Sequence, residues 1–286
     1  MQSGPSASII IPAHDEARVI TRLLDMLLAD TRPGEFDVLV VCNGCTDDTA
    51  RLARAHPGVS KVIDLAVSSK HAALLDGDAA ARVFPRIYLD ADVELGAADV
   101  RALTAAVSDG PVLAAAPQRD LRVSASTWPV RAYYDVWKRL PSVRDGLYGR
   151  GVLAVNEAGF ARIADRPPVT GDDLYVHTRF AERERAVITA ATSVVYGPRT
   201  TGDLIRRRAR TAAGNAELGM IDRAHAAPTS VGSARALAEL ARERPGLLGR
   251  IAVFVAITVA ARCWARVLRR RGGQATWLRD ESSRDR

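Results

Sequence analysis

Short apolar runs alternate with segments of helical spacing over the first 120 residues, and this alternation constrains the fold most. Ser8-Ile9-Ile10-Ile11-Pro12 is a continuous apolar run, which is typical of a buried parallel strand. In residues 16–28 the apolar positions recur at helical spacing. Further strands are predicted at 36–41, 62–66, 86–89 and 112–116, and further helices at 47–55, 71–83 and 98–107. The chain is therefore expected to be an α/β protein with a mainly parallel sheet flanked by helices.

Composition admits several partners. The 286 residues, 48% of them hydrophobic, suffice for a large core, and the net charge of +7 suits nucleic acid, anionic lipid or a phosphorylated small molecule. Lysine occurs only at Lys61, Lys70 and Lys138. Three cysteines are too few for a disulfide framework, and the N-terminus has no signal-peptide pattern. A cytoplasmic protein is expected.

Polar clusters follow three of the predicted strands, where parallel α/β sheets bind their ligands. Residues 13–16 read Ala-His-Asp-Glu, residues 43–48 read Asn-Gly-Cys-Thr-Asp-Asp, and residues 90–92 read Asp-Ala-Asp. Side chains two residues apart at a strand end point to the same side, so Asp90 and Asp92 can converge. Two carboxylates suit Mg²⁺ or Mn²⁺, which can hold a diphosphate; a solvated loop is the alternative.

Together these clusters and Lys70 resemble family 2 glycosyltransferases of the GT-A fold, across roughly residues 7–200. The resemblance implies a nucleoside diphosphate sugar as donor and Mn²⁺ or Mg²⁺ as cofactor. Asp92, with Asp90, would hold the metal, and Lys70 would border the diphosphate. The donor-binding residues that it implies are Pro12, Ala13, His14, Asp15, Glu16, Asn43, Gly44, Lys70, Asp90, Ala91 and Asp92.

The second cluster departs from the family, which usually has acidic residues where this chain has Cys42 and Asn43, and serine in place of Cys45. Cys42 is a poor acceptor for a base N–H, so the nucleotide stays open. The Cys-x-x-Cys spacing also permits a redox pair or half of a zinc site. Zinc would need two more ligands, and the chain has no second Cys-x-x-Cys or closely spaced histidine pair.

Gly171-Asp172-Asp173 resembles the acidic pair of the family, whose second carboxylate is the general base. The resemblance assigns Asp173 to this role, with Asp172 as the second choice. Residues 170–173 could equally cap a helix, and both roles are compatible. The segment from residue 118 onward is expected to bind the acceptor. Its candidate acceptor-binding residues are Trp137, Gly149, Arg150 and Gly151.

The basic run from Arg206 to Arg210 resembles a segment that closes over the diphosphate in related enzymes, which would make Arg207 and Arg210 donor contacts. A solvated helix face or an anionic membrane surface are the alternatives. The glutamine and tryptophan typical of processive polymer synthases are absent from this segment, so transfer of a single sugar is expected.

The C-terminal part differs in kind. Residues 251–261 form an apolar run between Arg250 and Arg262, shorter than the roughly 20 residues of a spanning helix. A helix lying in the membrane interface and a helix buried on the catalytic domain are both open. We expect a GT-A catalytic domain over 1–225, divided into a nucleotide half (7–117) and an acceptor half (118–225). A helical segment over 226–286 would follow, with peripheral membrane contact through 246–271 at the inner face of the cell membrane.

The sequence therefore predicts an inverting, metal-dependent transferase that moves one sugar to a hydroxyl acceptor, which the C-terminal helix hints is lipid-linked. Nucleic acid is not an expected partner. A non-catalytic relative that binds nucleotide sugar or a membrane surface is the alternative. A nucleotidyltransferase is a third reading, but its Gly-rich loop after the first strand is missing.

Overall fold

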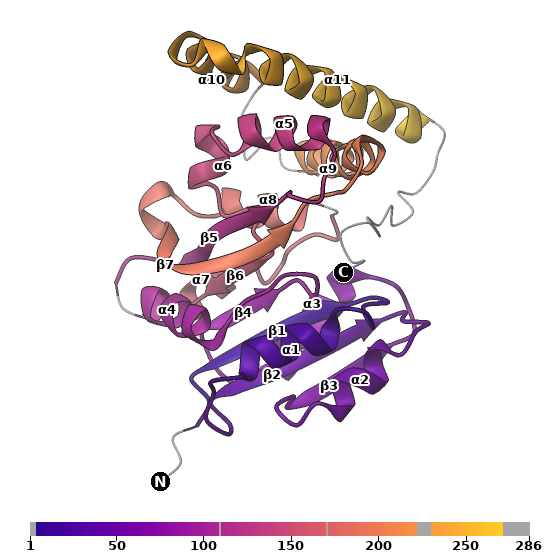
Figure 1. Ribbon diagram of the computed structural model, residues 1–286. Helices are drawn as coiled ribbons and strands as arrows, with labels where there is room; N and C mark the ends of the chain where they lie inside the picture. The colour runs from indigo at the N-terminus through magenta and orange to yellow at the C-terminus, as the bar shows by residue number, and fades with distance from the viewer. Residues whose placement is uncertain (1–3, 109, 170, 222–229, 271–286) are drawn as a thin grey trace. The chain divides into compact units, whose positions relative to one another are not determined.

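The computed structural model describes residues 4–108, 110–169, 171–221 and 230–270, which form two compact units (Figure 1). Unit 1 comprises Met1–Asp120, Gly149–Pro167 and Phe180–Val195. Unit 2 comprises Leu121–Tyr148, Pro168–Arg179 and Tyr196–Arg286. The chain thus passes between the units several times, and each unit is described by itself below.

A mixed, mainly parallel sheet of seven strands forms unit 1, in the order β3-β2-β1-β4-β6-β5-β7. Strands β1 and β2, β1 and β4, and β2 and β3 pair in parallel, whereas β6 is antiparallel to both β4 and β5. The predicted fold class is confirmed. The strands are β1 (Ala7–Ala13), β2 (Phe36–Asn43), β3 (Lys61–Leu65), β4 (Arg86–Leu89), β5 (Ala114–Arg122), β6 (Val152–Val155) and β7 (Arg185–Tyr196).

The helices of unit 1 follow the predicted order. They are α1 (Ile20–Leu28), α2 (Thr49–Ala55), α3 (Lys70–Ala80), α4 (Ala97–Ser108), α7 (Glu157–Ala161) and the 3-10 helix η1 (Glu182–Glu184). Helix α1 begins later than the predicted residue 16, because the backbone oxygen of Glu16 accepts from Val19 and Ile20 in a turn before the helix. Residues 14–19 therefore stay in a loop. This loop borders the carboxyl end of β1.

The core of unit 1 explains the uninterrupted apolar run in β1. Ile9, Ile10 and Ile11 are all fully buried, so both faces of the strand are covered. Burying each such side chain contributes about 1.5–3 kcal/mol. Helix α3 approaches the sheet closely at Gly77, where a Cβ would lie 2.4 Å from Ile10 Cγ2. Helix α3 therefore packs directly on the strand that leads to the first polar loop.

Unit 2 is built mainly of helices. They are α5 (Trp128–Trp137), α6 (Pro141–Asp145), α8 (Asp172–Thr178), α9 (Thr201–Ile221), α10 (Ser230–Glu243), the 3-10 helix η3 (Pro245–Leu247) and α11 (Leu248–Arg270). Helix α11 packs on α5 and α9 (Figure 1). The ring of Tyr133 stacks on Phe254 at 4.7 Å, and Arg250 pairs with Asp135. Aromatic stacking thus joins α5 to α11.

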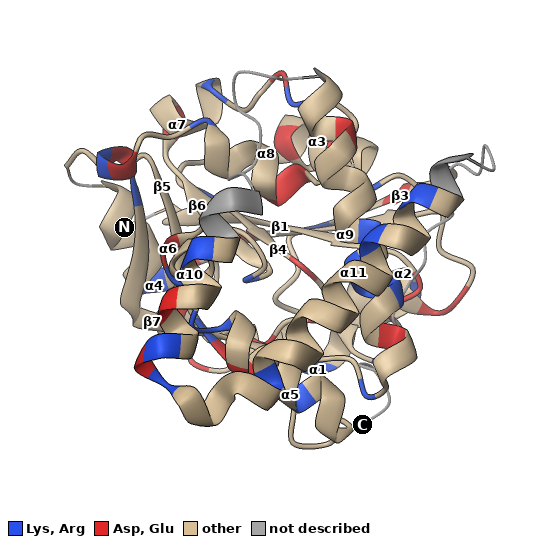
Figure 2. Ribbon diagram, turned by 90° about the horizontal axis from the view of Figure 1, so that it is seen from above, with Lys and Arg blue, Asp and Glu red and all other residues tan. Residues whose placement is uncertain are grey.

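Helix α11 leaves an apolar face uncovered. Its buried side includes Phe254, Ile257 and Ala261, whereas its exposed apolar side chains are Leu248, Val255, Val259, Trp264 and Val267. Most of the α11 ribbon is tan, the colour of residues other than Lys, Arg, Asp and Glu (Figure 2). Over Pro245–Val267 the chain is long and apolar enough to cross a membrane, and 22% of that window is buried. The helix therefore has both a packed face and an apolar face open to solvent.

Candidate nucleotide-sugar site

The strand order has a topological switch point between β1 and β4, because the chain winds outward from β1 in one direction and from β4 in the other. Ligands of parallel α/β sheets bind at the carboxyl ends of strands at such a point. The structure brings the three predicted polar clusters to this edge of unit 1. Pro12 and Ala13 remain within β1, paired with Val41 and Cys42, and the loop begins at His14.

Lys70 and Asp90 form an ion pair at this edge, with Nζ 2.9 Å from Oδ1. Ser69 accepts a hydrogen bond from the Ala72 N–H and caps α3, which makes Lys70 the first residue of the helix. Asp90 follows the last residue of β4, and its side chain is 40% exposed. A compact ammonium therefore lies beside Asp90, one of the two predicted metal-binding carboxylates, where it would also attract phosphate.

The loop after β4 is shaped by Gly151. The Asp90 N–H donates to the Gly151 oxygen at 2.8 Å, and Gly151 has a φ of +66°. A Cβ there would lie 2.3 Å from Val93 Cγ2 and 3.4 Å from Asp90 Oδ2. Only glycine fits this position without moving the loop, because both the backbone conformation and the space exclude a side chain. Gly151 therefore helps to hold Asp90 in place.

The donor set after β4 fits a hard divalent cation. Asp90 and Asp92 supply carboxylate oxygens from one loop, and Ala91 between them is buried. Mg²⁺ and Mn²⁺ are commonly held by one or two carboxylates, with substrate phosphates and water completing the shell. These two residues are therefore suited to hold the cation that the resemblance implies.

The loop after β1 is tied to the loop after β2 through Asp15, which has a φ of 48°. Its Oδ1 accepts from the N–H groups of Thr46 at 2.6 Å and Asp47 at 3.3 Å. Partial burial acts to raise the pKa of Asp15, but the Thr46 hydrogen bonds and the neighbouring His14 outweigh it, so the pKa is lowered. Glu16 is buried, and its N–H donates to Thr49 Oγ1 at 2.7 Å. The two loops thus support each other through buried and charged contacts.

His14 and Asn43 add a second link. His14 Nδ1 lies 2.6 Å from the Asn43 backbone oxygen, and because a carbonyl only accepts, Nδ1 must carry the proton. The Asn43 side chain donates from Nδ2 to the Ala13 oxygen at 2.8 Å. Its Oδ1 is buried and finds no partner within the described part of the chain, which costs about 1–3 kcal/mol. Such orphaned groups call for a functional explanation.

Gly44 follows with a φ of +62°, and a Cβ there would lie 2.7 Å from the Ser68 nitrogen. The loop after β2 can therefore pass close to the segment before α3 only with glycine at this position. Contact of this loop with the base and ribose of the donor remains a prediction.

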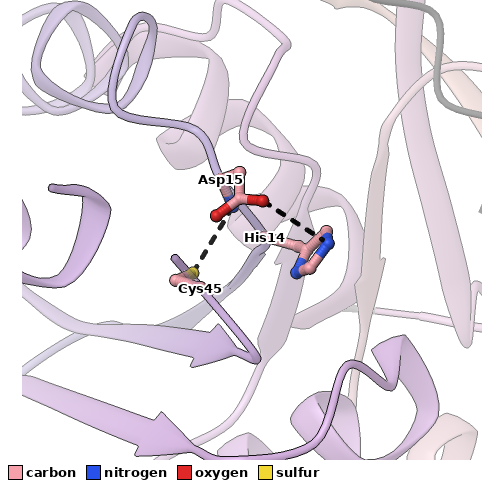
Figure 3. A group of neighbouring side chains, drawn as sticks. All are labelled: His14, Asp15 and Cys45. Atoms are coloured by element: carbon pink, nitrogen blue, oxygen red, sulfur yellow. Dashed lines mark hydrogen bonds and ion pairs between the residues drawn. The ribbon is translucent and has the colours of Figure 1, made fainter. Parts of the chain in front are cut away.

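Cys45 is the unexpected member of this edge. Its Sγ accepts from the Asp15 N–H at 3.4 Å, and the Cys42 thiol also donates to it. The Cys42 contact is the main reason why the pKa of Cys45 falls to about 7, while the same contact and burial raise the pKa of Cys42. His14, Asp15 and Cys45 each offer one ligand atom, and these atoms lie within 4.8 Å of one another (Figure 3).

The predicted acceptor-binding residues of unit 1 make hydrogen bonds to neighbouring strands of the sheet. Arg150 is 3% exposed, and its guanidinium donates to the Pro117 oxygen at 3.0 Å. Arg119 donates to the Gly149 oxygen at 2.7 Å, and Ser193 to the Arg150 oxygen at 2.9 Å. These contacts join the segment before β6 to its neighbours in the sheet. An acceptor-binding role for Gly149, Arg150 and Gly151 stays a prediction.

The remaining predicted residues lie in unit 2. Asp172 and Asp173 occupy the first turn of α8, and Asp173 Oδ1 accepts from the Leu174 N–H at 2.8 Å, while Thr170 lies outside the described residues. Trp137 packs edge-to-face on Tyr134 at 5.5 Å. Arg207 donates from α9 to the Tyr196 oxygen at 3.3 Å, and Arg210 lies one turn further along. Their assigned roles remain predictions.

A parallel sheet with carboxylates, a lysine and tied polar loops at its switch point is the architecture of the GT-A class of nucleotide-sugar transferases. The family model described as "Glycosyl transferase family 2" matches residues 8–163, so the chain belongs to that family. This confirms the resemblance inferred from the motifs.

Solved structures with the same fold are distant in sequence. A mannosyltransferase from Pyrobaculum calidifontis, in complex with GDP-Man and Mn²⁺, matches with a TM-score of 0.58 and 21% identity, covering 95% of this chain and 80% of the other. Glucosyl-3-phosphoglycerate synthase from Mycobacterium tuberculosis, with Mn²⁺, UDP and glucosyl-3-phosphoglycerate, matches with a TM-score of 0.55 and 18% identity, covering 79% and 82%. No curated protein matches the chain at a significant level.

Proposed function

We propose that this protein is an inverting glycosyltransferase, which moves a single sugar from a nucleoside diphosphate sugar to a hydroxyl acceptor with the help of Mn²⁺ or Mg²⁺. The observation that carries the proposal is the Lys70–Asp90 ion pair at the carboxyl end of β4. It sets the Lys70 ammonium beside Asp90, the first carboxylate of Asp90-Ala91-Asp92, at the switch point of a family 2 sheet.

The chain's own residues would bind and orient the donor. The loops after β1 and β2 border the nucleotide, with the unsatisfied Oδ1 of Asn43 as an acceptor that a ligand N–H could satisfy after a small rotation. Lys70 attracts the diphosphate, and Asp90 and Asp92 hold the cation. When bound, this cation neutralises the negative charge that develops on the leaving diphosphate.

Inversion requires a base on the face of the sugar opposite to the diphosphate. Asp173 is proposed to take the proton of the acceptor hydroxyl as its oxygen attacks the anomeric carbon, with Asp172 as the second choice. The position of both carboxylates in the first turn of α8 supports this role, because the turn fixes their backbone. Arg207 and Arg210 on α9 are proposed to contact the diphosphate, and Trp137 the acceptor.

The first test is calorimetric titration of UDP and GDP with and without Mn²⁺. Binding that depends on Mn²⁺ is expected for one of the two nucleotides, since Mn²⁺ accompanies GDP-Man in one similar structure and UDP in the other. Failure of both nucleotides, and of dTDP, to bind the folded protein would favour the non-catalytic alternative.

The base assignment has its own test. Asp173→Asn is expected to leave nucleotide binding within about threefold and to slow transfer by about 10²–10⁴-fold, the usual contribution of general acid–base catalysis. Asp172→Asn is the matched control on the same turn. Turnover of Asp173→Asn close to that of the parent protein would make the assignment wrong.

A peripheral membrane contact through residues 246–271 is also proposed, which would place the enzyme at the inner face of the cell membrane beside a lipid-linked acceptor. The exposed apolar side chains of α11 support it, together with Arg262 and Arg266 near Trp264. Flotation with anionic vesicles is expected to carry the protein upward, and Val255→Glu with Val259→Glu to abolish this. Met220→Glu, at an exposed apolar position of α9, is the control.

A further inference from the structure

His14, Asp15 and Cys45 form a cluster of possible metal ligands within the two loops that are proposed to border the nucleotide (Figure 3). The three residues come from the loops after β1 and β2, about thirty positions apart in sequence. Each is partly buried, so the cluster is neither sealed in the core nor fully hydrated. Its combination of sulfur, imidazole nitrogen and carboxylate oxygen differs from the oxygen-only set after β4.

The distances suit one metal ion. His14 Nε2 lies 3.8 Å from Asp15 Oδ2, and ligand atoms of all three residues lie within 4.8 Å of one another. Tetrahedral zinc has bonds of about 2.0 Å to nitrogen and oxygen and about 2.3 Å to sulfur, which puts neighbouring ligand atoms roughly 3.3–3.6 Å apart. Side-chain rotations that close these gaps by about 1 Å would complete the triangle.

Each ligand is already oriented by another contact. The Nδ1–H of His14 is donated to the Asn43 oxygen, so the lone pair is on Nε2, the nitrogen nearer to Asp15. Asp15 uses Oδ1 for the Thr46 N–H, while Oδ2 is the oxygen toward His14. Cys45 Sγ accepts from the Asp15 N–H and its thiol donates to the Ala13 oxygen at 3.5 Å, so a bound ion would take the place of the thiol proton. Outer hydrogen bonds of this kind are usual around metal-bound histidine and carboxylate.

The donor chemistry selects the class of ion. Thiolate and imidazole favour zinc-like ions, whereas Mg²⁺ and Mn²⁺ prefer oxygen ligands only. The side chains of His14 and Asp15 are 17% and 29% exposed, so an ion can reach them from solvent and a water can serve as fourth ligand. Three protein ligands with one open position is the arrangement of zinc sites that bind a further ligand.

We propose that His14, Asp15 and Cys45 bind a divalent cation of the zinc class, at a second metal site separate from Asp90 and Asp92. The site joins the loop after β1 to the loop after β2, so the bound ion stabilises the carboxyl edge of the sheet. The site lies in the loops that are proposed to border the nucleotide, but its test measures a thiolate–metal bond, so its failure is distinguishable from a failure of the proposed transfer.

The test is a titration of the full-length, untagged protein with Co²⁺ and then Zn²⁺, in a phosphine reductant and excess Mg²⁺. Co²⁺ is expected to give the near-ultraviolet band of a thiolate–cobalt bond at one equivalent, and Zn²⁺ to displace it. Excess Mg²⁺ should not compete, because it binds thiolate poorly. The melting temperature is expected to rise with Zn²⁺ through mass action.

The variants identify the ligands. Cys45→Ser is expected to remove the band. His14→Gln and Asp15→Asn are each expected to lower the affinity for Zn²⁺ by about tenfold to a hundredfold or more, since loss of a supporting partner alone costs that much. Cys263→Ser, at the exposed cysteine of α11, should leave the spectrum unchanged. Asp92→Asn should also leave it unchanged.

Two results would overturn the proposal. The first is the absence of a thiolate–cobalt band in the folded parent protein. The second is a band that persists in Cys45→Ser or disappears in Cys263→Ser. If Cys45→Ser fails to fold, judged by circular dichroism, His14→Gln and Asp15→Asn decide in its place, and unchanged Zn²⁺ affinity in both contradicts the site. Nucleotide binding that depends on Mn²⁺ is measured separately, so failure here leaves the proposed transfer untouched.

Discussion

Two loop regions at the same edge of the sheet in unit 1 differ in their donor chemistry. The loop after β4 offers the Asp90 and Asp92 carboxylates beside Lys70. The loops after β1 and β2 offer sulfur, nitrogen and oxygen, held by main-chain hydrogen bonds. We therefore propose different ions for the two regions: Mn²⁺ or Mg²⁺ with the donor diphosphate after β4, and a zinc-class ion at the loops after β1 and β2. The comparison shows that the fold determines where a ligand can bind, at the carboxyl ends of the strands, whereas the side chains of each loop determine which kind of ligand binds there.

The largest expected effect separates the two regions. Asp92→Asn should weaken nucleotide binding in Mn²⁺ by about a hundredfold or more, because the loss of a metal ligand is worth several kcal/mol. The same variant should keep the thiolate–cobalt band. Calorimetry and absorption spectroscopy measure the two effects on one preparation. Loss of both signals together would mean that the two regions form a single site.

Gly151 tests how far the loop after β4 depends on backbone shape. Gly151→Ala is expected to destabilise the protein by about 1–3 kcal/mol beyond backbone strain, since the new methyl meets Val93 at 2.3 Å. Gly34→Ala is the matched control, because Gly34 has a φ of +74° and nothing within 4 Å of the added Cβ. Urea unfolding of both variants gives the difference. Equal losses would show that crowding against Val93 is unimportant.

Lys70 tests the charge beside the carboxylates. Lys70→Gln should weaken binding of the nucleoside diphosphate by about tenfold, because a charge-assisted contact to phosphate is lost. Its effect on the thiolate–cobalt band should be negligible. Lys61→Gln, an exposed lysine of β3, serves as the control in the same titration. Equal affinities of the two variants would assign Lys70 a structural role only.

The smallest expected effect concerns the reactivity of Cys45 in the loop after β2. Because the pKa of Cys45 is about 7, about half of the Cys45 side chains are thiolate at pH 7. The rate of Cys45 alkylation by iodoacetamide should therefore level off above pH 7. A cysteine of ordinary pKa, as in the unfolded chain, should react about tenfold more slowly at pH 7. Peptide mass spectrometry against pH measures both. A rate that rises about eightfold between pH 7 and pH 8, as for a thiol of ordinary pKa, would contradict the lowered pKa.

Much of the fold could be predicted from residues alone. The fully buried Ile9, Ile10 and Ile11 give β1 its continuous apolar run, and the predicted strands and helices of unit 1 appear in the predicted order. Boundaries were less accurate, as at α1, because the turn at Glu16 depends on hydrogen bonds that periodicity does not encode. The partners of Arg150 were equally hidden, since they come from β5 and β7.

The sequence by itself determined the class of protein, because strand–helix alternation and short motifs are local and their spacing places Asp90 and Asp92 after a strand. Only the tertiary structure showed which residues lie beside Cys45. Searching along the chain finds no further zinc ligands near the Cys-x-x-Cys, whereas parallel pairing of β1 with β2 brings His14 and Asp15 to Cys45 across about thirty residues. Strand pairing makes distant residues neighbours, and no local pattern records which loops will meet.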